Sequence, residues 1–219
     1  MRRAALLQSA KGKGKSSAWL KRHVNDPFVQ NAKKDNLRSR SAFKLEEILQ
    51  KHRIIQPHYR VVDLGAAPGG WSLSAVKALR GTGRLIAIDL LPIKSIDNCE
   101  FIQGDFLSQE VREELVRKLS SSSSGQVDCV LSDMLHNMTG HKQTDHFRSM
   151  NLVYSVFDFA KEHLQRSQNS SMLVKLLRGE DESEFLADLR DEFDSVKVIK
   201  PAASRKDSAE MYVLARGKK

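Results

Sequence analysis

The chain has 219 residues, of which 40% are hydrophobic and 29% charged, and its formal net charge is +9. This composition is typical of a globular domain and excludes an intrinsically disordered chain. No apolar run is long enough to cross a bilayer, so we expect no membrane partner. The two cysteines, Cys99 and Cys129, lack the paired spacing of a zinc or redox site. We therefore predict reduced thiols and no metal site.

The positive charge is concentrated at the N-terminus. Residues 1–60 hold 15 Lys and Arg against four acidic residues, whereas the rest of the chain carries 21 basic and 23 acidic side chains. This distribution indicates a polyanionic partner, although a solvated basic tail has the same composition. We assign residues 1–35 to a basic N-terminal extension and residues 36–219 to one domain. The first 15 residues mix Arg, Ala, Leu and Ser without an acid, which a mitochondrial transit peptide also allows.

The domain is predicted to begin with a helix and to continue as alternating strands and helices. Within residues 36–52, apolar residues recur at helical spacing. Apolar runs typical of strands follow at 59–64, 84–89, 100–103, 127–132, 172–177, 196–199 and 211–215. Amphipathic segments separate most of them, at 70–79, 109–119, 147–164 and 182–193. This alternation predicts an α/β, Rossmann-like domain with a mostly parallel seven-stranded sheet. Because no long helix separates the last two runs, we expect the final strand to be antiparallel.

A glycine-rich turn, DLGAAPGGW from Asp63 to Trp71, joins the first strand to the next helix. In open α/β sheets, ligands bind beside such turns at the carboxyl ends of the strands. Gly65, Gly69 and Gly70 allow the backbone to approach a ligand closely, and the amides at the helix start can bind an anionic group. The glycine spacing differs from the G-x-G-x-x-G pattern of dinucleotide-binding proteins, which disfavours a nicotinamide dehydrogenase.

Aspartates also follow the second and third strands. Asp89 ends the second strand, where a carboxylate can accept hydrogen bonds from ribose hydroxyls. Asp105 follows the third strand in QGDF and could accept a hydrogen bond from an adenine amino group. Each aspartate alone is more often a turn or cap residue. After three successive strands, Asp63, Asp89 and Asp105 together are a more specific sign of a cofactor site.

Short segments spread over most of the chain resemble a single family. They are SSAWLKRHVNDPFV (16–29), LRSRSAFKLEEI (37–48), VVDLGAAPGGW (61–71), IDLLPI (88–93), QGDF (103–106), LSDM (131–134), VK (174–175) and KPAASRKDSAEMYVLA (200–215). Together they resemble the FtsJ (RrmJ) family of ribosomal RNA ribose 2′-O-methyltransferases. This resemblance implies an S-adenosyl-L-methionine-dependent methyltransferase whose partner is large-subunit ribosomal RNA or a ribosomal particle.

The resemblance also implies the residues of the site. The catalytic residues would be Lys44, Asp133, Lys175 and Glu210. The cofactor contacts would be Gly69, Gly70, Trp71, Asp89, Asp105 and Asp133. A ribose hydroxyl is a weak nucleophile, so methylating it needs a base and close alignment with the methyl donor. We predict that Lys175 takes the hydroxyl proton, because a partly desolvated lysine beside another cation can act as a base. Lys44 would orient the hydroxyl or phosphate, while Asp133 and Glu210 hold the two ammonium groups.

Basic residues of the extension are expected to contact RNA phosphates, which supply affinity but little sequence selectivity. They are Lys11, Lys13, Lys15, Lys21, Arg22, Lys33, Lys34, Arg38 and Arg40, with Arg205 and Lys206 on the other side of the cleft. The chain departs from the family pattern after Asp133, where Leu135 and His136 replace the usual Ala-Pro. We therefore expect a different substrate-loop shape at this point.

Several alternatives remain open from the sequence. The segments HRIIQP and KPAASRKDS and the Arg/Ala-rich start are most similar to mitochondrial members, so we expect a mitochondrial protein, with the bacterial cytoplasm as the alternative. The expected target is a uridine of the peptidyl-transferase A-loop, again by resemblance. A tRNA ribose methyltransferase or a non-catalytic rRNA-binding assembly factor are the other candidate functions. Carbon-5 cytosine methylation is disfavoured because it needs a nucleophilic cysteine beside the site and Cys129 lies inside a strand, and amino-group methylation because DMLH stands in place of a Pro-Pro-aromatic loop. We take a monomer as the default.

Overall fold

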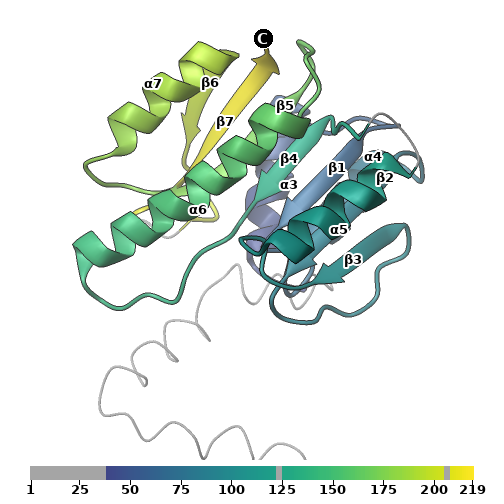
Figure 1. Ribbon diagram of the computed structural model, residues 1–219, viewed down its shortest axis with the longest axis horizontal. Coiled ribbons are helices and arrows are strands. Elements are labelled where there is room, and N and C mark those ends of the chain that lie inside the picture. The colour runs from purple at the N-terminus through teal and green to yellow at the C-terminus, as the bar shows by residue number, and fades with distance from the viewer. Residues whose placement is uncertain (1–37, 122–124, 205–207) are drawn as a thin grey trace, which may run out of the picture.

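The fold is a single seven-stranded sheet with helices on both faces (Figure 1). The computed structural model describes residues 38–121, 125–204 and 208–219, so the predicted extension 1–35 lies outside the described residues. The strand order is β3-β2-β1-β4-β5-β7-β6. The strands are β1 (Arg60–Leu64), β2 (Arg84–Asp89), β3 (Cys99–Gln103), β4 (Cys129–Ser132), β5 (Ser171–Leu177), β6 (Phe193–Ile199) and β7 (Glu210–Lys218). β7 is antiparallel to both of its neighbours and the other pairs are parallel, which confirms the predicted fold class.

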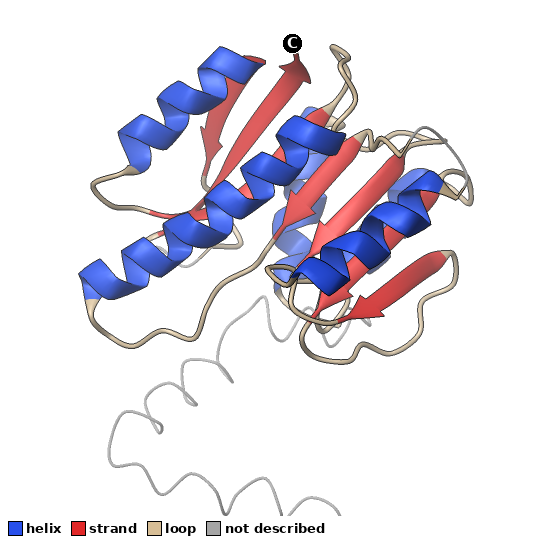
Figure 2. Cartoon of the chain, in the orientation of Figure 1, coloured by secondary structure: helices blue, strands red, loops and turns tan. Residues whose placement is uncertain are grey.

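The helices bury both faces of the sheet (Figure 2). On one face lie α5 (Gln109–Ser120), α6 (Lys142–His163) and α7 (Glu182–Glu192); on the other lie α3 (Ser41–His52) and α4 (Gly70–Leu79). Because side chains alternate along a strand, Val62 and Leu64 pack in the first core while Val61 packs in the second. No helix in the described part of the chain is long and apolar enough to span a membrane.

The largest difference from the predicted elements is at the start of α6. The sequence predicts a helix from residue 147, but α6 begins at Lys142. The first turn carries no apolar residue, so hydrophobic periodicity cannot detect it. Its Asp145 is nevertheless buried and hydrogen-bonded to the preceding loop. Tertiary contacts therefore hold a turn that the apolar pattern does not reveal.

The strand register brings the predicted catalytic residues together. Leu64 pairs with Ser132, so the glycine-rich turn and Asp133 leave the sheet side by side. Ser132 pairs with Val174, which places Lys175 next to Asp133. Since β7 is antiparallel, its first residues meet the last residues of β5 at this same edge.

Lys218, at the end of β7, anchors the other end of the sheet to α6. Its Nζ donates hydrogen bonds to the main-chain oxygens of Ala160 (3.1 Å), Lys161 and Leu164 (2.9 Å) at the helix C-terminus. Burial lowers the pKa of Lys218. A cation at this position satisfies carbonyl groups that the helix leaves without a partner and interacts favourably with the helix dipole.

We expect Lys218→Met to lower the free energy of unfolding by about 1–3 kcal/mol, because it leaves buried carbonyls unsatisfied while keeping the apolar stem. Urea denaturation would measure the change. Lys219→Met is the control, since Lys219 makes similar bonds to Arg190 and Asp191 at an exposed helix end. Equal losses in the two variants would contradict the role assigned to burial.

Candidate active site

The four predicted catalytic residues lie together at the edge where the parallel strands end. Asp133 follows β4, and its amide donates to the oxygen of Leu64 at the end of β1. Lys175 is in β5 and Glu210 is the first residue of β7, where it pairs with Leu177. Lys44 comes from α3, whose stripe of Leu45 and Ile48 packs against the sheet.

A continuous chain of polar contacts links these side chains. Lys175 Nζ lies 2.9 Å from Asp133 Oδ1 and donates to the main-chain oxygen of Asp133 at 2.7 Å. The hydroxyl of Tyr212 donates to the same Asp133 Oδ1 at 2.7 Å. Lys44 Nζ donates to that hydroxyl at 3.3 Å and to Glu210 Oε2 at 3.0 Å. Each ammonium group therefore has one carboxylate partner, and Tyr212 joins the two ion pairs.

Tyr212 is the member of this chain that sequence reasoning missed. It pairs directly with Lys175 across β5 and β7, and it is completely buried. Its ring packs on Trp71 with centroids 5.4 Å apart. Burial first, and then the charge and hydrogen bond of Asp133, raise the pKa of Tyr212 well above its usual value. The hydroxyl thus stays protonated and acts as a donor to Asp133.

The two lysines of the cluster are largely shielded from solvent, which makes their charge balance important. Lys44 and Lys175 are only 7% and 8% exposed. Burial would raise the pKa of Glu210, but the charges of Lys44 and Lys175 outweigh it, and the pKa is lowered. Glu210 is therefore a carboxylate at neutral pH. Two buried ammonium groups are costly unless paired, and the two carboxylates supply that pairing.

The glycine-rich turn lies beside this cluster and packs closely against the loop after Asp133 and the residues before α3. Gly65 has a φ of 76°, and a Cβ there would lie 2.8 Å from the backbone nitrogen of Met134, in the loop after Asp133. Gly69 has a φ of 99° and caps α4, and a Cβ there would lie 2.7 Å from the guanidinium of Arg38. The two glycines therefore allow Met134 and Arg38 to approach the turn closely, while the first amides of α4 have no hydrogen-bond partner within the helix.

Three aspartates surround the turn. Asp63 is fully buried, and burial is the main cause that raises its pKa to about 7. Its Oδ2 accepts from Ser72 at 2.6 Å, and its Oδ1 has no hydrogen-bond partner among the described residues. Asp89 accepts from the amides of Ala67 and Leu91, each at 2.8 Å, and Asp105 accepts from its own loop. By accepting these hydrogen bonds, Asp89 and Asp105 stabilise their loops. Their carboxylate oxygens retain lone pairs that can accept further hydrogen bonds.

Trp71 and the two arginines predicted to contact RNA take part in internal contacts. Trp71 is 2% exposed, and its indole donates to the oxygen of Ser41 at 2.8 Å, so the ring makes internal contacts. Arg38 donates to the oxygens of Lys94 (2.6 Å) and Ser95 (2.8 Å), in the loop after β2. Arg40 donates to Ala203 at 2.6 Å. These arginines hold the start of α3 over the strand ends. The remaining basic residues of the predicted RNA contact lie outside the described residues.

The loop that departs from the family pattern is fixed by Asp145. This buried carboxylate accepts from Thr139 N and Oγ1, both at 2.8 Å, and from Gly140 N at 3.0 Å. His136 Nε2 lies 3.3 Å away from it. The hydrogen bonds of Thr139 hold the pKa of Asp145 well below its usual range, against the opposing effect of burial. The neighbouring His146 contacts Asp181, so the first turn of α6 holds the loops that follow both Asp133 and Lys175.

Comparisons with known proteins agree with this geometry. The profile of one family, described as FtsJ-like methyltransferase, matches residues 37–218. A ribosomal RNA large subunit methyltransferase E from Xanthobacter autotrophicus is 46% identical over 215 residues, covering 96% of this chain and 82% of the relative. Its namesake from Pseudomonas fluorescens is 45% identical over 202 residues, covering 92% and 94%. A solved ribosomal RNA methyltransferase from Plasmodium falciparum superposes with a TM-score of 0.73 at 26% identity, covering 83% of this chain and 98% of that chain.

These relatives correct the expected localisation. The similar large subunit methyltransferases come from bacteria, so the expectation of a mitochondrial protein is wrong, and they point to the bacterial cytoplasm instead. The misleading features were the segments HRIIQP and KPAASRKDS and the Arg/Ala-rich start, whose composition a transit peptide and a basic RNA-binding tail share.

The geometry and the comparisons lead to one assignment. Two buried ion pairs joined by Tyr212 lie beside a glycine-rich turn, at the edge where α/β proteins bind their ligands. The family profile covers this whole region, and relatives above 40% identity span more than nine-tenths of the chain. The chain belongs to the FtsJ-like methyltransferase family.

Proposed function

We propose that the protein methylates a ribose 2′-hydroxyl of large-subunit ribosomal RNA, with S-adenosyl-L-methionine as the methyl donor. The observation that carries this proposal is the buried chain Lys175–Asp133–Tyr212–Lys44–Glu210, which ends beside the glycine-rich turn. Burying two lysines in this way is costly for stability alone and is typical of a site that handles protons.

The residues around the turn fit this cofactor. Gly69, Gly70 and the start of α4, whose first amides have no partner within the helix, would receive its carboxylate. Asp89 would accept hydrogen bonds from the ribose hydroxyls of the cofactor, and Asp105 would accept one from its adenine amino group. Asp133 would lie near the methionine part of the cofactor. Trp71 would contribute its backbone amide. When bound, the cofactor supplies an electrophilic methyl group.

Lys175 is the proposed base. In its neutral amine form, its two N–H groups would point to Oδ1 and the main-chain oxygen of Asp133, and its lone pair would accept the proton of the ribose hydroxyl. Lys44 would hold the hydroxyl or the adjacent phosphate, with Glu210 as its counter-ion. Tyr212 keeps Asp133 in place by donating to the same oxygen that Lys175 contacts. This arrangement provides the alignment and proton acceptor that a weakly nucleophilic hydroxyl requires.

The substrate assignment is supported by the relatives and by charge. Proteins named ribosomal RNA large subunit methyltransferase E are 42–46% identical over more than nine-tenths of this chain. Residues 1–60 carry 15 basic against four acidic side chains. Phosphate contacts of this kind supply the affinity for RNA. We place the target at a uridine of the peptidyl-transferase A-loop, as the resemblance implies.

The direct test is methyl transfer from labelled S-adenosylmethionine to undermodified large ribosomal subunits, with free large-subunit RNA and tRNA as parallel substrates. We expect label in the large subunit, recovered after alkaline hydrolysis as a single resistant dinucleotide, because a 2′-O-methyl group blocks cleavage. Cofactor binding without transfer would favour the assembly-factor alternative. Transfer to tRNA alone would reject the ribosomal target.

Replacing the proposed base should separate binding from chemistry. We expect Lys175→Met to lower kcat by about 10²-fold or more, as removal of a general base does, with cofactor affinity nearly unchanged. Single-turnover kinetics and calorimetry would measure the two quantities. Lys161→Met is the control, because Lys161 is an exposed lysine of α6 paired with Asp158. Near-normal turnover in a folded Lys175→Met protein would exclude the assignment.

Tyr212→Phe tests the link between the two ion pairs. It keeps the ring against Trp71 but removes the donor to Asp133, so we expect kcat to fall about tenfold or more while KM changes little. Tyr154→Phe is a matched control, since Tyr154 donates to Asp188 at 3.0 Å on the other face of the sheet. If both variants lowered kcat equally, Tyr212 would have no specific part in the site.

A further inference from the structure

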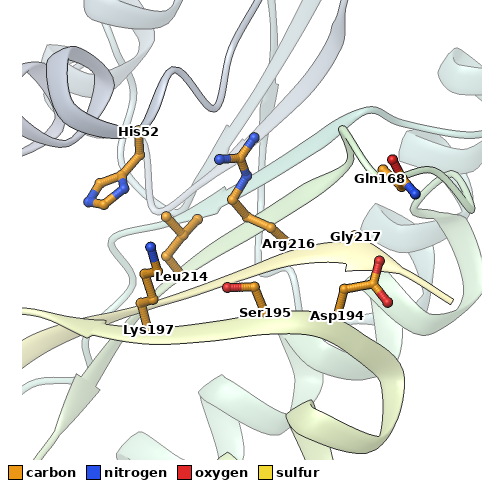
Figure 3. A pocket seen from close by; sticks show the side chains of 8 residues that line it. All are labelled: His52, Gln168, Asp194, Ser195, Lys197, Leu214, Arg216 and Gly217. Carbon is orange, nitrogen blue, oxygen red and sulfur yellow. The ribbon is translucent and has the colours of Figure 1, made fainter.

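A second polar site lies at the opposite end of β7 from the candidate active site. A hollow of about 180 Å³ opens there, between the end of α3, β6 and β7 (Figure 3). Tyr212, Leu214 and Arg216 alternate onto one face of β7, so they share the side covered by α3. α3 ends at His52, and Arg216 lies at the hollow beyond it.

Three basic side chains meet in this hollow. Figure 3 shows the guanidinium of Arg216 and the ammonium of Lys197 on the same side as the imidazole of His52. The one acidic residue among the described lining residues, Asp194, lies at the other end beside Gly217. Burial, followed by the charges of Lys197, Arg216 and Lys51, lowers the pKa of His52, as expected where the local potential is positive.

Arg216 is the partly buried cation of this hollow, whereas Lys197 is exposed. Within the described ranges, no ion pair or side-chain hydrogen bond involves His52, Lys197 or Arg216, and the buried Nε of Arg216 has no hydrogen-bond partner. A buried N–H without an acceptor costs free energy, so it points to a ligand that supplies one. Leu214 adds an apolar lining, which strengthens electrostatic attraction in the hollow.

We propose that this hollow binds a phosphate group. The planar guanidinium group of Arg216 can donate two parallel hydrogen bonds to phosphate oxygens. Lys197 adds an ammonium group on a flexible side chain. The phosphate could be a phosphodiester of RNA, which rests on the proposed function, or a free phosphate ion. Arg216 lies six residues beyond Glu210 along β7, or about 20 Å. A phosphodiester here would therefore belong to a part of the RNA distant from the target ribose.

The first experiment is an NMR titration of the full ¹⁵N-labelled chain with inorganic phosphate, at constant ionic strength with chloride as the reference anion. We expect saturable shifts of the Arg216 Nε–H and the His52 imidazole. Lys197→Gln and Arg216→Gln should each weaken phosphate binding about tenfold or more. Lys51→Gln, an equal loss of charge one residue from His52 but outside the hollow, should change it less than twofold. Because Lys197 is exposed, its variant remains informative even where Arg216→Gln fails to fold.

The second experiment identifies the source of the phosphate. If the source is RNA, Lys197→Gln should weaken RNA binding and reduce the slope of log affinity against log salt by about 0.7–0.9. Unchanged RNA binding together with lost phosphate binding would assign the site to a free phosphate ion. No saturable response to phosphate, or an unaltered response in Lys197→Gln and folded Arg216→Gln, would overturn the proposal. The titration uses neither RNA nor methyl donor, so its outcome does not depend on methyl transfer.

Discussion

The shared hydrogen-bond acceptor Asp133 Oδ1 is the contact on which the site depends. Lys175 and Tyr212 both reach it, from adjacent antiparallel strands, and Tyr212 in turn accepts from Lys44. Removing this one oxygen would leave a buried ammonium without its counter-ion and a buried hydroxyl without its acceptor, which is a large penalty. The arrangement exists only because β7 enters antiparallel and presents Tyr212 opposite Lys175. The direction of β7 therefore determines which side chains can form hydrogen bonds to Asp133.

The same register explains why a cofactor turn and a proton-handling cluster are neighbours. β1 and β4 are adjacent, so the turn after Leu64 and the loop after Ser132 leave the sheet together, and Gly65 leaves room for Met134. α3 then covers this edge, fixed by Arg38 to the loop after β2 and by Arg40 to the loop after β6. Arg38 and Arg40, which the composition assigns to RNA contact, thus help to hold α3 over the site. Charge alone cannot distinguish the two roles, because both place a basic residue near the N-terminus of the domain.

Much of the fold follows from local sequence, whereas the site follows only in part. The apolar run at 84–89 coincides with β2, which is buried on both faces, and the amphipathic segment at 70–79 coincides with α4. Lys44 is different: on a helix it reads as a solvated lysine, and only the resemblance singled it out. Tyr212 was missed because an aromatic residue in MYVLA predicts core, and it is indeed core. Its polar role depends on which strand lies opposite, and this pairing between distant segments is not encoded in any local pattern.

The substitution of Leu135 and His136 for Ala-Pro bears on whether the loop after Asp133 keeps a defined shape. Proline would restrict this backbone directly by fixing φ. Here, Asp145 accepts three hydrogen bonds from Thr139 and Gly140 and also contacts His136, so order comes from side-chain to backbone contacts instead. These bonds hold the pKa of Asp145 well below its usual range, so Asp145 is a carboxylate at neutral pH. In this chain, a buried carboxylate rather than a proline therefore orders the loop after Asp133.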